Sequence, residues 1–321
     1  MRMSKPFVIV CAAVLALSAA IAHAQDYPTK PIKLIVPFGP GGGTDIVARL
    51  FGKFLEERWK QPVVVENRPG ANGIIGTEMA KNAPADGYTL TTSGNSSHAA
   101  AAHMFKKLPY DPVKDFEGIG LFGVLGSVAL VPNDSPFKSI PELVTYAKTH
   151  PGRMFYGYFN TSSQIPGALL QATANIPIEG VPYKSIANAV PDLISGQIQL
   201  MFLDAVAAKA HISSGRLIPL AVTDGSRVAR LPNVPAMAEF YPGYEVQAFI
   251  SLSAPAGTPK PIVAKLNQAM RDAEAVPAYR EQLEALGLRL HPLSPEEYRA
   301  FLLKEIDRWG LYVKTAKIEP Q

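Results

Sequence analysis

Short apolar runs alternate with amphipathic stretches along the first part of the chain. Residues 31–36 form one apolar run, and residues 44–57 then repeat apolar side chains at helical spacing. Further apolar runs at 63–66 and 88–92 flank a second helical stretch at 74–82. Strands that alternate with helices predict a parallel sheet and therefore an α/β fold.

The same alternation begins again at Ser127, after which strands and helices are predicted at 128–131, 140–149, 154–158, 166–174, 180–183, 186–195, 198–203 and 218–223. A long β-like run, 244–253, and three helical segments follow. C-terminal helices that follow a second α/β unit indicate that the chain returns to pack against the first unit. We therefore expect two lobes, lobe one from residues 25–126 plus 249–321 and lobe two from residues 127–248.

The first 24 residues have the pattern of a secretory signal peptide. Arg2 and Lys5 precede an apolar run at 7–22, which ends in Ala-His-Ala at 22–24. We expect residues 1–24 to be cleaved, which predicts a periplasmic protein. The single cysteine, Cys11, lies inside this segment, so the mature chain is expected to lack disulfides.

The charged residues narrow the range of partners. The sequence has 31 Lys and Arg against 27 Asp and Glu, and its longest basic run is Lys106-Lys107. No nucleic-acid partner is expected from such a pattern. The histidines at 98, 103, 150, 211 and 291 show no metal-ligand spacing, so we expect no metal and no cofactor.

A glycine loop follows the first predicted strand and opens the first predicted helix. Consecutive glycines allow backbone N–H groups to converge at a helix N-terminus, which favours an anion. Phosphate loops carry Lys and Ser/Thr after the last glycine, whereas Thr44-Asp45 follows here, so we expect a carboxylate. We expect Gly42 to need a positive φ, and Asp45 either caps its helix or accepts a ligand donor. The candidate binding residues of this loop are Phe38, Gly41, Gly42, Gly43, Thr44 and Asp45.

Two more polar loops come directly after predicted strands, where open α/β sheets bind their ligands. The candidates of the first are Ser93, Asn95, Ser96, Ser97 and His98. Those of the second are Phe159, Asn160, Thr161, Ser162 and Ser163. Lys184, Phe202 and Asp204 complete the candidate set.

Sequence patterns typical of enzymes are weak in this chain. Residues 118–123 match G-x-G-x-x-G, but β-like residues follow where a crossover helix is required. Residues 135–138 match S-x-x-K inside a proline turn. We expect no catalysis, although a secreted hydrolase and a ligand-sensing subunit for a membrane kinase remain alternatives.

Several motifs occur in an order that spans most of the chain: VPFGPGGGTD (36–45), VENRPGANG (65–73), PADGYTL (84–90), LPYDP (108–112), VPYK (181–184), LPNVP (231–235) and APAGTP (254–259). With these motifs the chain resembles the Bug family, the periplasmic receptors of tripartite tricarboxylate transporters. The resemblance implies a type II-like periplasmic binding protein fold, in which parallel-rich sheets are joined by two crossing strands. It also implies a monomer that delivers a small carboxylate to membrane transporter subunits.

The resemblance implies that residues 38–45 and 159–163 bind the ligand carboxylate. This chain departs from the family pattern in lobe two, where Tyr158-Phe159-Asn160-Thr161 stand in place of a glycine-serine loop and Ser185 replaces a glycine. Rings at Phe38 and Phe159 favour a flat ligand. We therefore expect an aromatic mono- or dicarboxylate, with a far acid held by Ser96, Ser97, His98 or Lys184.

Overall fold

The structure is a computed structural model that describes residues 27–320, so the expected signal peptide lies outside the described residues. Lobe one begins with three strands, β1 (Ile32–Val36), β2 (Val63–Asn67) and β3 (Thr89–Gly94). β1 pairs in parallel with both of the others. Two helices connect the strands, α2 (Gly43–Trp59) and α3 (Ile74–Lys81), as the sequence pattern predicts.

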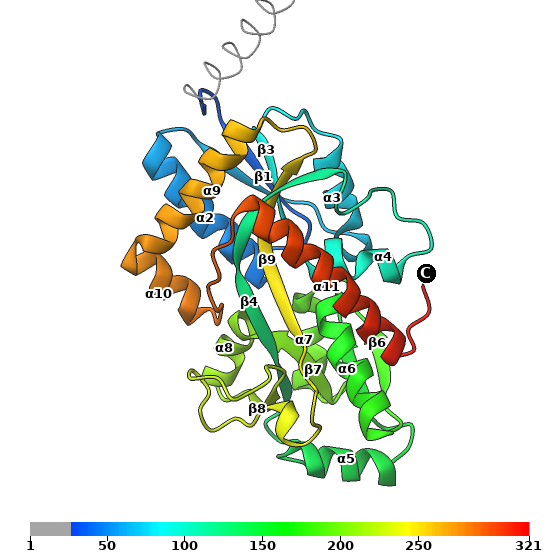
Figure 1. The fold of residues 1–321 in the computed structure, drawn as a ribbon. Helices are drawn as coiled ribbons and strands as arrows, with labels where there is room; N and C mark the ends of the chain where they lie inside the picture. The colour runs from blue at the N-terminus through cyan, green and yellow to red at the C-terminus, as the bar shows by residue number, and fades with distance from the viewer. Residues whose placement is uncertain (1–26, 321) are drawn as a thin grey trace, which may run out of the picture.

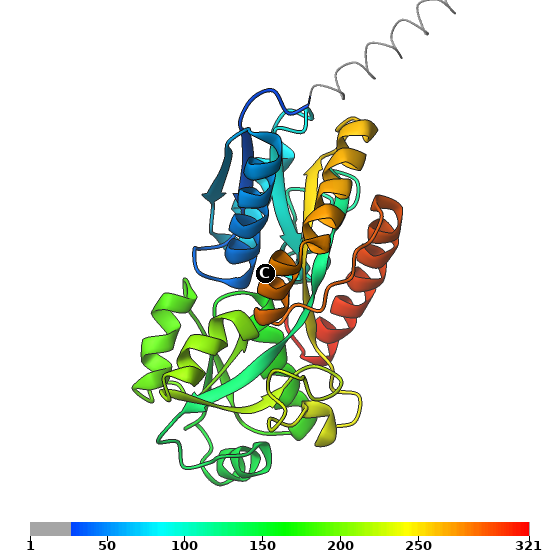
Figure 2. The same ribbon diagram turned by 90° about the vertical axis from the view of Figure 1, so that its left-hand side faces the viewer.

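Two long strands cross between the lobes (Figures 1 and 2). β4 (Phe116–Pro132) is 17 residues long, and β9 (Gln247–Pro255) runs antiparallel to it. The expected lobe boundaries at 126/127 and 248/249 fall inside these two continuous strands. The glycine-rich first half of β4 was not predicted as a strand, because glycine is depleted in strands.

The second lobe repeats the α/β pattern below the crossing strands in Figure 1. β5 (Phe155–Tyr158) pairs in parallel with β6 (Glu179–Pro182) and β7 (Leu200–Asp204), whereas β7 and β8 (Leu217–Val222) run antiparallel to β4. Sheet order is β2-β1-β3-β9-β4-β7-β5-β6, with β8 on β4. The helices of this lobe are α5 (Ile140–Thr149), α6 (Thr161–Ala174), α7 (Ile186–Ile194) and α8 (Ala205–Ser213).

Two helices of this lobe differ from the sequence prediction. α6 begins at Thr161, five residues before the predicted start at 166, because Asn160 and Ser163 form a capping box around its first turn. α8 was not predicted at all. Short polar residues favour turns as well as helix caps, so the pattern at 160–163 does not distinguish a loop from a helix start.

The C-terminal helices cover one side of both lobes. α9 (Lys260–Ala275) and α10 (Pro277–Ala285) contribute to the apolar core of lobe one. α11 (Pro295–Thr315) lies across the crossing strands, and its fully buried Trp309 belongs to the core that includes β5, α6 and β7 (Figure 1). α11 therefore packs against both lobes.

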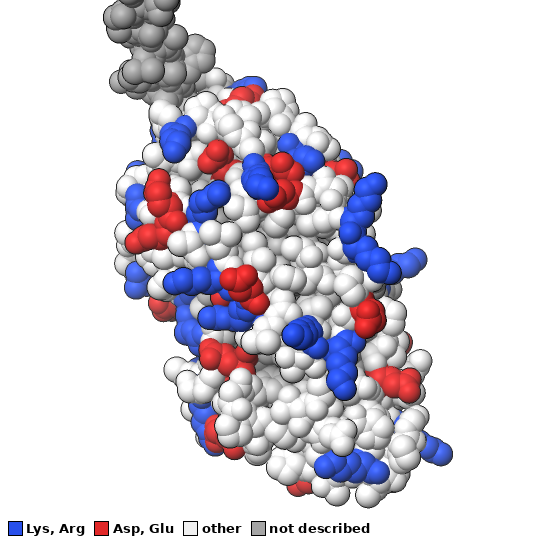
Figure 3. All heavy atoms as spheres, turned by 45° about the vertical axis from the view of Figure 1, so that its right-hand side comes forward, with Lys and Arg blue, Asp and Glu red and all other residues white. Residues whose placement is uncertain are grey.

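Shorter turns complete the described chain: η1 (Ala71–Gly73), a π-helical turn η2 (Asn95–Ala99), α4 (Ala101–Met104) and η3 (Met237–Glu239). Within residues 27–320, no helix is both long and apolar enough to cross a bilayer. On the face drawn in Figure 3, basic and acidic side chains are interspersed.

Candidate functional site

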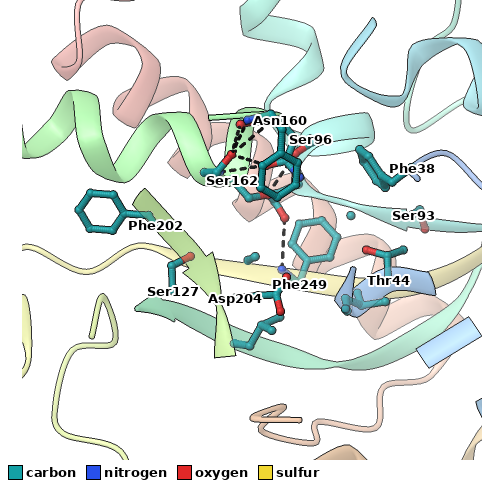
Figure 4. A pocket seen from close by; sticks show the side chains of 18 residues that line it. Phe38, Thr44, Ser93, Ser96, Ser127, Asn160, Ser162, Phe202, Asp204 and Phe249 are labelled. Atoms are coloured by element: carbon teal, nitrogen blue, oxygen red, sulfur yellow. Dashed lines mark hydrogen bonds between the residues drawn. The ribbon is translucent and has the colours of Figure 1, made fainter. Parts of the chain in front are cut away.

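A pocket of about 60 Å³ lies between the lobes, where β1, β3, β5 and β7 end and the crossing strands pass (Figure 4). Hydroxyl, amide and phenylalanine side chains dominate its walls. We call it the inner pocket, and its lining is Phe38, Gly43, Thr44, Ser93, Gly94, Asn95, Ser96, Leu125, Ser127, Phe159, Asn160, Ser162, Ser163, Phe202, Asp204, Ala248, Phe249 and Ile250.

A larger pocket of about 550 Å³ adjoins the inner pocket and shares Phe38, Thr44 and Asp204 with it. We call it the outer pocket. Lys184, an exposed candidate, lines it together with Gly42 and Asp45. The segment from Pro69 to Gly73 forms another part of its wall. The combined space therefore widens from the inner pocket into the outer pocket.

Asp45 holds the glycine loop in place. Its carboxylate accepts hydrogen bonds from the Gly41 N–H at 3.0 Å, from Arg49 Nε at 3.1 Å and from Asn67 Nδ2 at 2.9 Å. Asn67 Nδ2 also donates to the Phe38 carbonyl at 3.0 Å, so both ends of the loop are tied to one cluster. Burial alone would raise the pKa of Asp45, but the bonds from Arg49, Gly41 and Asn67 hold the pKa below its ordinary value.

The expectation that Gly42 adopts a positive φ was wrong. Gly42 has a φ of −82°, and a Cβ added there would meet nothing within 4 Å. The left-handed conformation falls instead on Gly41, with a φ of +86°. Gly41 lies outside the lining of both the inner and the outer pocket, so its part is to turn the chain into the α2 N-terminus.

Two helix N-termini point toward the inner pocket, and their capping differs. At α6, the side chain of Asn160 accepts the Ser163 N–H at 3.0 Å. At α2, the N-cap residue is Gly42, which has no side chain to cap the first turn. The first-turn N–H groups of a helix carry partial positive charge, so the α2 end in particular attracts an anion.

Polar side chains from the two lobes meet directly over the pocket. Asn95 Nδ2 donates to Ser162 Oγ at 2.5 Å, and Ser96 Oγ lies 3.1 Å from the same oxygen. In Figure 4 Asn160, Ser162 and Ser96 lie together on one side of the pocket. The strand-end loops expected from the sequence are therefore brought into contact with each other.

Ser93 joins the pocket to a buried hydroxyl cluster. Its Oγ lies 2.8 Å from the Oγ atoms of both Ser251 and Ser253 on β9. Ser251 Oγ donates to the Ser93 carbonyl at 3.0 Å and also lies 2.8 Å from the Tyr298 hydroxyl on α11. The orientation of the Ser93 hydroxyl is thus set by residues from two other segments, β9 and α11.

Ser97, His98 and Thr161 do not line the inner or the outer pocket, which corrects the expectation that they contact ligand. All three are fully buried. His98 packs against Phe116 with ring centroids 4.8 Å apart, and burial lowers its pKa to about 3. The chain turns from β3 into η2 at Asn95, which directs the later side chains of the loop into the interior.

The sequence prediction missed several lining residues on the crossing strands, namely Leu125, Ser127, Ala248 and Ile250. Phe249 also lines the pocket from β9. From the sequence, this part of the chain was interpreted as the boundaries between the lobes and not as a part of the binding site. Because pairing between β4 and β9 joins residues more than a hundred positions apart, no local pattern identifies their pocket-facing side.

The described residues contain no group of three or more His, Cys, Asp or Glu side chains placed to hold a metal ion. Ser97 Oγ and His98 Nδ1 lie 3.0 Å apart, a pair that superficially suggests a nucleophile and its base. Both side chains are fully buried, and neither lines a pocket at the lobe junction. This pair has no access to a substrate there.

Two lobes joined by crossing strands, with a polar pocket between them, define a periplasmic solute-binding protein. Residues 47–318 match the model of the tripartite tricarboxylate transporter family receptor. The chain belongs to this family, which includes the Bug proteins. Protein BugT of Bordetella pertussis, strain Tohama I, is 34% identical over 300 residues, which cover 92% of each chain.

Solved structures agree with the fold and the family. The structure of R. palustris Rpa4515 with adipate is 32% identical, has a TM-score of 0.89, and is matched over 92% of this chain and 100% of its own. MatC (Rpa3494) from Rhodopseudomonas palustris with bound malate is 31% identical, with a TM-score of 0.84 and coverage of 89% and 100%. The α/β, two-lobed periplasmic binding protein fold expected from the sequence is confirmed.

Proposed function

We propose that this chain captures a small carboxylate in the periplasm and presents it to the membrane subunits of a tripartite tricarboxylate-type transporter. The observation that carries the proposal is the inner pocket. Two helix N-termini, hydroxyl groups and amides converge there, and its lining includes no lysine or arginine. Helix N-termini and neutral donors suit one carboxylate, whose single charge needs no cationic side chain.

The ligand carboxylate is assigned to the space between the α2 and α6 N-termini. Thr44 and the Gly43 amide approach from lobe one, and Ser162 approaches from lobe two. Adipate and malate, the ligands named with two related structures, both carry carboxylates. Ser93, Asn95, Ser96, Asn160 and Ser163 supply further polar groups around the same space.

The walls of the inner pocket favour a ligand with an aromatic body. Phe38, Phe159, Phe202 and Phe249 all contribute to the lining. Phe202 and Phe249 also belong to the hydrophobic core, so Phe38 and Phe159 are the rings most available to a ligand. Aromatic pairs add roughly 0.5–1.5 kcal/mol beyond area burial, which supports an aromatic mono- or dicarboxylate whose far acid reaches Lys184.

Four further assignments belong to this proposal. Residues 1–24 are a cleaved signal peptide, and the mature protein acts as a monomer. Lobe one comprises residues 25–126 plus 249–321, and lobe two comprises residues 127–248. The ligand leaves chemically unchanged, because the protein binds and does not catalyse. The family match to transporter receptors supports the transport role over the hydrolase and sensor alternatives.

A thermal-shift screen of mono-, di- and tricarboxylates, aliphatic and aromatic, tests the proposal. A ligand present at about 100 times its dissociation constant stabilises a protein by about 2.7 kcal/mol, which raises the melting temperature. Mass spectrometry of the released compound should return it unchanged. Thr44→Ala should reduce the shift by about half or more, while Thr145→Ala, at an exposed position on α5, should retain it. Absence of a shift with any carboxylate, or release of an altered compound, would reject the proposal.

A further inference from the structure

Two arginines cross the junction between the lobes in opposite directions. Arg289, in the segment between α10 and α11 of lobe one, donates from Nη1 to Asp224 Oδ1 of lobe two at 2.7 Å. Arg230, in the loop after β8 of lobe two, donates from Nη1 to the Gly287 carbonyl of lobe one at 3.0 Å. We call these four residues the interlobe clasp. Each lobe supplies one arginine and one acceptor to it.

The lobe-one half of the clasp is anchored by the fold. Leu288 belongs to the apolar core of lobe one. The backbone of Arg289 exchanges two hydrogen bonds with Val124 on β4, at 2.8 and 3.0 Å, so this segment lies beside a crossing strand (Figure 2). Gly287 has a φ of +89°, and a Cβ built on it would overlap the Arg230 guanidinium. The absence of a side chain at this position leaves room for the arginine from lobe two.

The lobe-two half of the clasp is anchored where the crossing strands enter that lobe. Asp224 follows β8 and is buried. The preceding residue, Thr223, accepts the Ser127 N–H with Oγ1 at 2.8 Å and donates to the Val246 carbonyl at 2.6 Å. A Cβ on Gly126 would overlap the Asp224 carboxylate, so this carboxylate packs directly against the backbone of β4.

The clasp spans the part of β4 about which the lobes can rotate. Its lobe-one half is attached at Val124 and its lobe-two half at Ser127, three residues further along the strand. The strand has glycine at 118, 120, 123 and 126, and its pairing with β9 shifts register twice between 118 and 123. Glycines and bulges allow a strand to bend. Rotation about this segment would separate each arginine from its acceptor in the other lobe.

None of the four clasp residues lines the inner or the outer pocket. A ligand reaches the inner pocket when the lobes part, because the hydrogen bond from Asn95 to Ser162 joins the two lobes directly over it. Arg230 interacts electrostatically with Asp204, which lines the inner pocket. An effect of the clasp on ligand affinity must therefore act through the arrangement of the lobes or through charge at a distance.

We propose that Arg230 and Arg289 are positioning residues, which hold the lobes closed and so set the affinity for carboxylates without contacting them. The inference rests on the carboxylate binding between the lobes proposed above, but on no particular carboxylate. The apparent affinity of a ligand equals its affinity for the closed form multiplied by the closed fraction. Contacts that stabilise the closed form therefore strengthen the binding of every ligand by the same factor.

Calorimetric titration of Arg289→Gln and Arg230→Gln with a monoacid and the matching diacid tests this inference. Benzoate and terephthalate share a ring, and hexanoate and adipate share a chain, so the pair that binds wild type is used. Each variant should lose about five- to tenfold in affinity, by the same factor for monoacid and diacid. Arg289→Lys keeps the charge opposite Asp224 and should lose less. Arg153→Gln, at an exposed position in lobe two, should bind like wild type.

A distance measurement without any ligand tests the arrangement of the lobes directly. The expected mature chain has no cysteine, so Lys53→Cys in lobe one and Ser213→Cys in lobe two, both exposed, provide unique sites for spin labels. Electron–electron resonance should show a closed population in ligand-free wild type. In Arg289→Gln this population should fall at least about threefold, and the bound acid should restore it.

Two outcomes would overturn the inference. The first is the same distance distribution in ligand-free wild type and both variants. The second is an affinity loss that is larger for the diacid, since an effect of charge at a distance grows with ligand charge. If no carboxylate binds wild type while the distances still shift as expected, the proposed function fails and the clasp stands. If Arg289→Gln does not fold, the double variant Asp224→Asn/Arg289→Gln, which removes both charges, takes its place.

Discussion

Asn95, at the end of β3, donates a hydrogen bond of 2.5 Å to the hydroxyl of Ser162, in the first turn of α6. The two residues belong to different lobes and to loops 67 positions apart. Asn95 Oδ1 also accepts the Phe249 N–H at 3.4 Å, so one side chain connects β3, α6 and a crossing strand. Contacts of this kind tie the lobes together at the ligand pocket.

Ser162→Ala should therefore weaken carboxylate binding. The change removes an acceptor for Asn95 and a donor for the ligand, and a lost hydrogen bond to a charged group costs about 1.5–3 kcal/mol, or roughly ten- to a hundredfold in affinity. Ser213→Ala, at an exposed position near the end of α8, is the control. Equal affinity of wild type and Ser162→Ala in calorimetry would remove this residue from the site.

Asp45→Asn should loosen the glycine loop without unfolding the protein. The charged bond to Arg49 is lost, and an amide cannot accept from Gly41, Arg49 and Asn67 as a carboxylate does. We expect an affinity loss of at least about tenfold with an unchanged circular dichroism spectrum. Asp134→Asn serves as the surface control. An unaltered affinity would show that the loop holds its shape without Asp45.

Tyr298→Phe should affect both stability and binding, although Tyr298 does not line the inner pocket. Loss of its hydroxyl leaves Ser251 with one partner fewer and costs about 1 kcal/mol in the free energy of unfolding. Ser93, which shares the cluster, then reorients its hydroxyl at the pocket. Tyr241→Phe, which removes a tyrosine hydroxyl at another position, is the control. A stability loss without any change in affinity would refute the link to the ligand.

His98 predicts a pH dependence of stability. Burial lowers its pKa from 6.5 to about 3, so the unfolded chain takes up a proton well before the folded protein does. The free energy of unfolding should therefore fall as pH drops from about 6.5 toward 3, by about 1.4 kcal/mol per pH unit from this side chain. Urea unfolding at about pH 7 and about pH 5 measures the slope.

The control for this prediction is His98→Gln, which should flatten that part of the slope. Ring chemical shifts in NMR provide a second measurement that does not depend on the variant. They should show His98 neutral in the folded protein at about pH 5. A ring that titrates near its ordinary pKa would contradict the buried, neutral state.

The parts of the site that depend on local chemistry could be predicted from the sequence. The glycine loop before α2 and the polar residues at the ends of β3 and β5 carry their own signals, because glycines and short polar side chains mark turns and caps. The aromatic residue Phe159 was expected at the pocket for the same local reason. Most of these residues line the inner or the outer pocket, and the exceptions are Gly41, Ser97, His98 and Thr161.

The remaining lining residues depend on long-range pairing. Ser127 and Ile250 reach the pocket from β4 and β9, whose register is set by contacts between distant segments. His98 failed as a candidate for a related reason, since the direction of η2 is decided by packing against Tyr110 and Phe116. A pattern of polar residues shows where a loop begins but does not show which way its later side chains point.

Titration calorimetry of wild type, Thr44→Ala and Thr145→Ala with the best carboxylate from the screen tests the central claim most directly. We expect each wild-type molecule and each Thr145→Ala molecule to bind one ligand molecule. Thr44→Ala should stay folded and lose at least about tenfold in affinity, because Thr44 lines the inner pocket at the α2 N-terminus. Equal binding by all three proteins would place the ligand outside the pocket between the lobes and contradict the account.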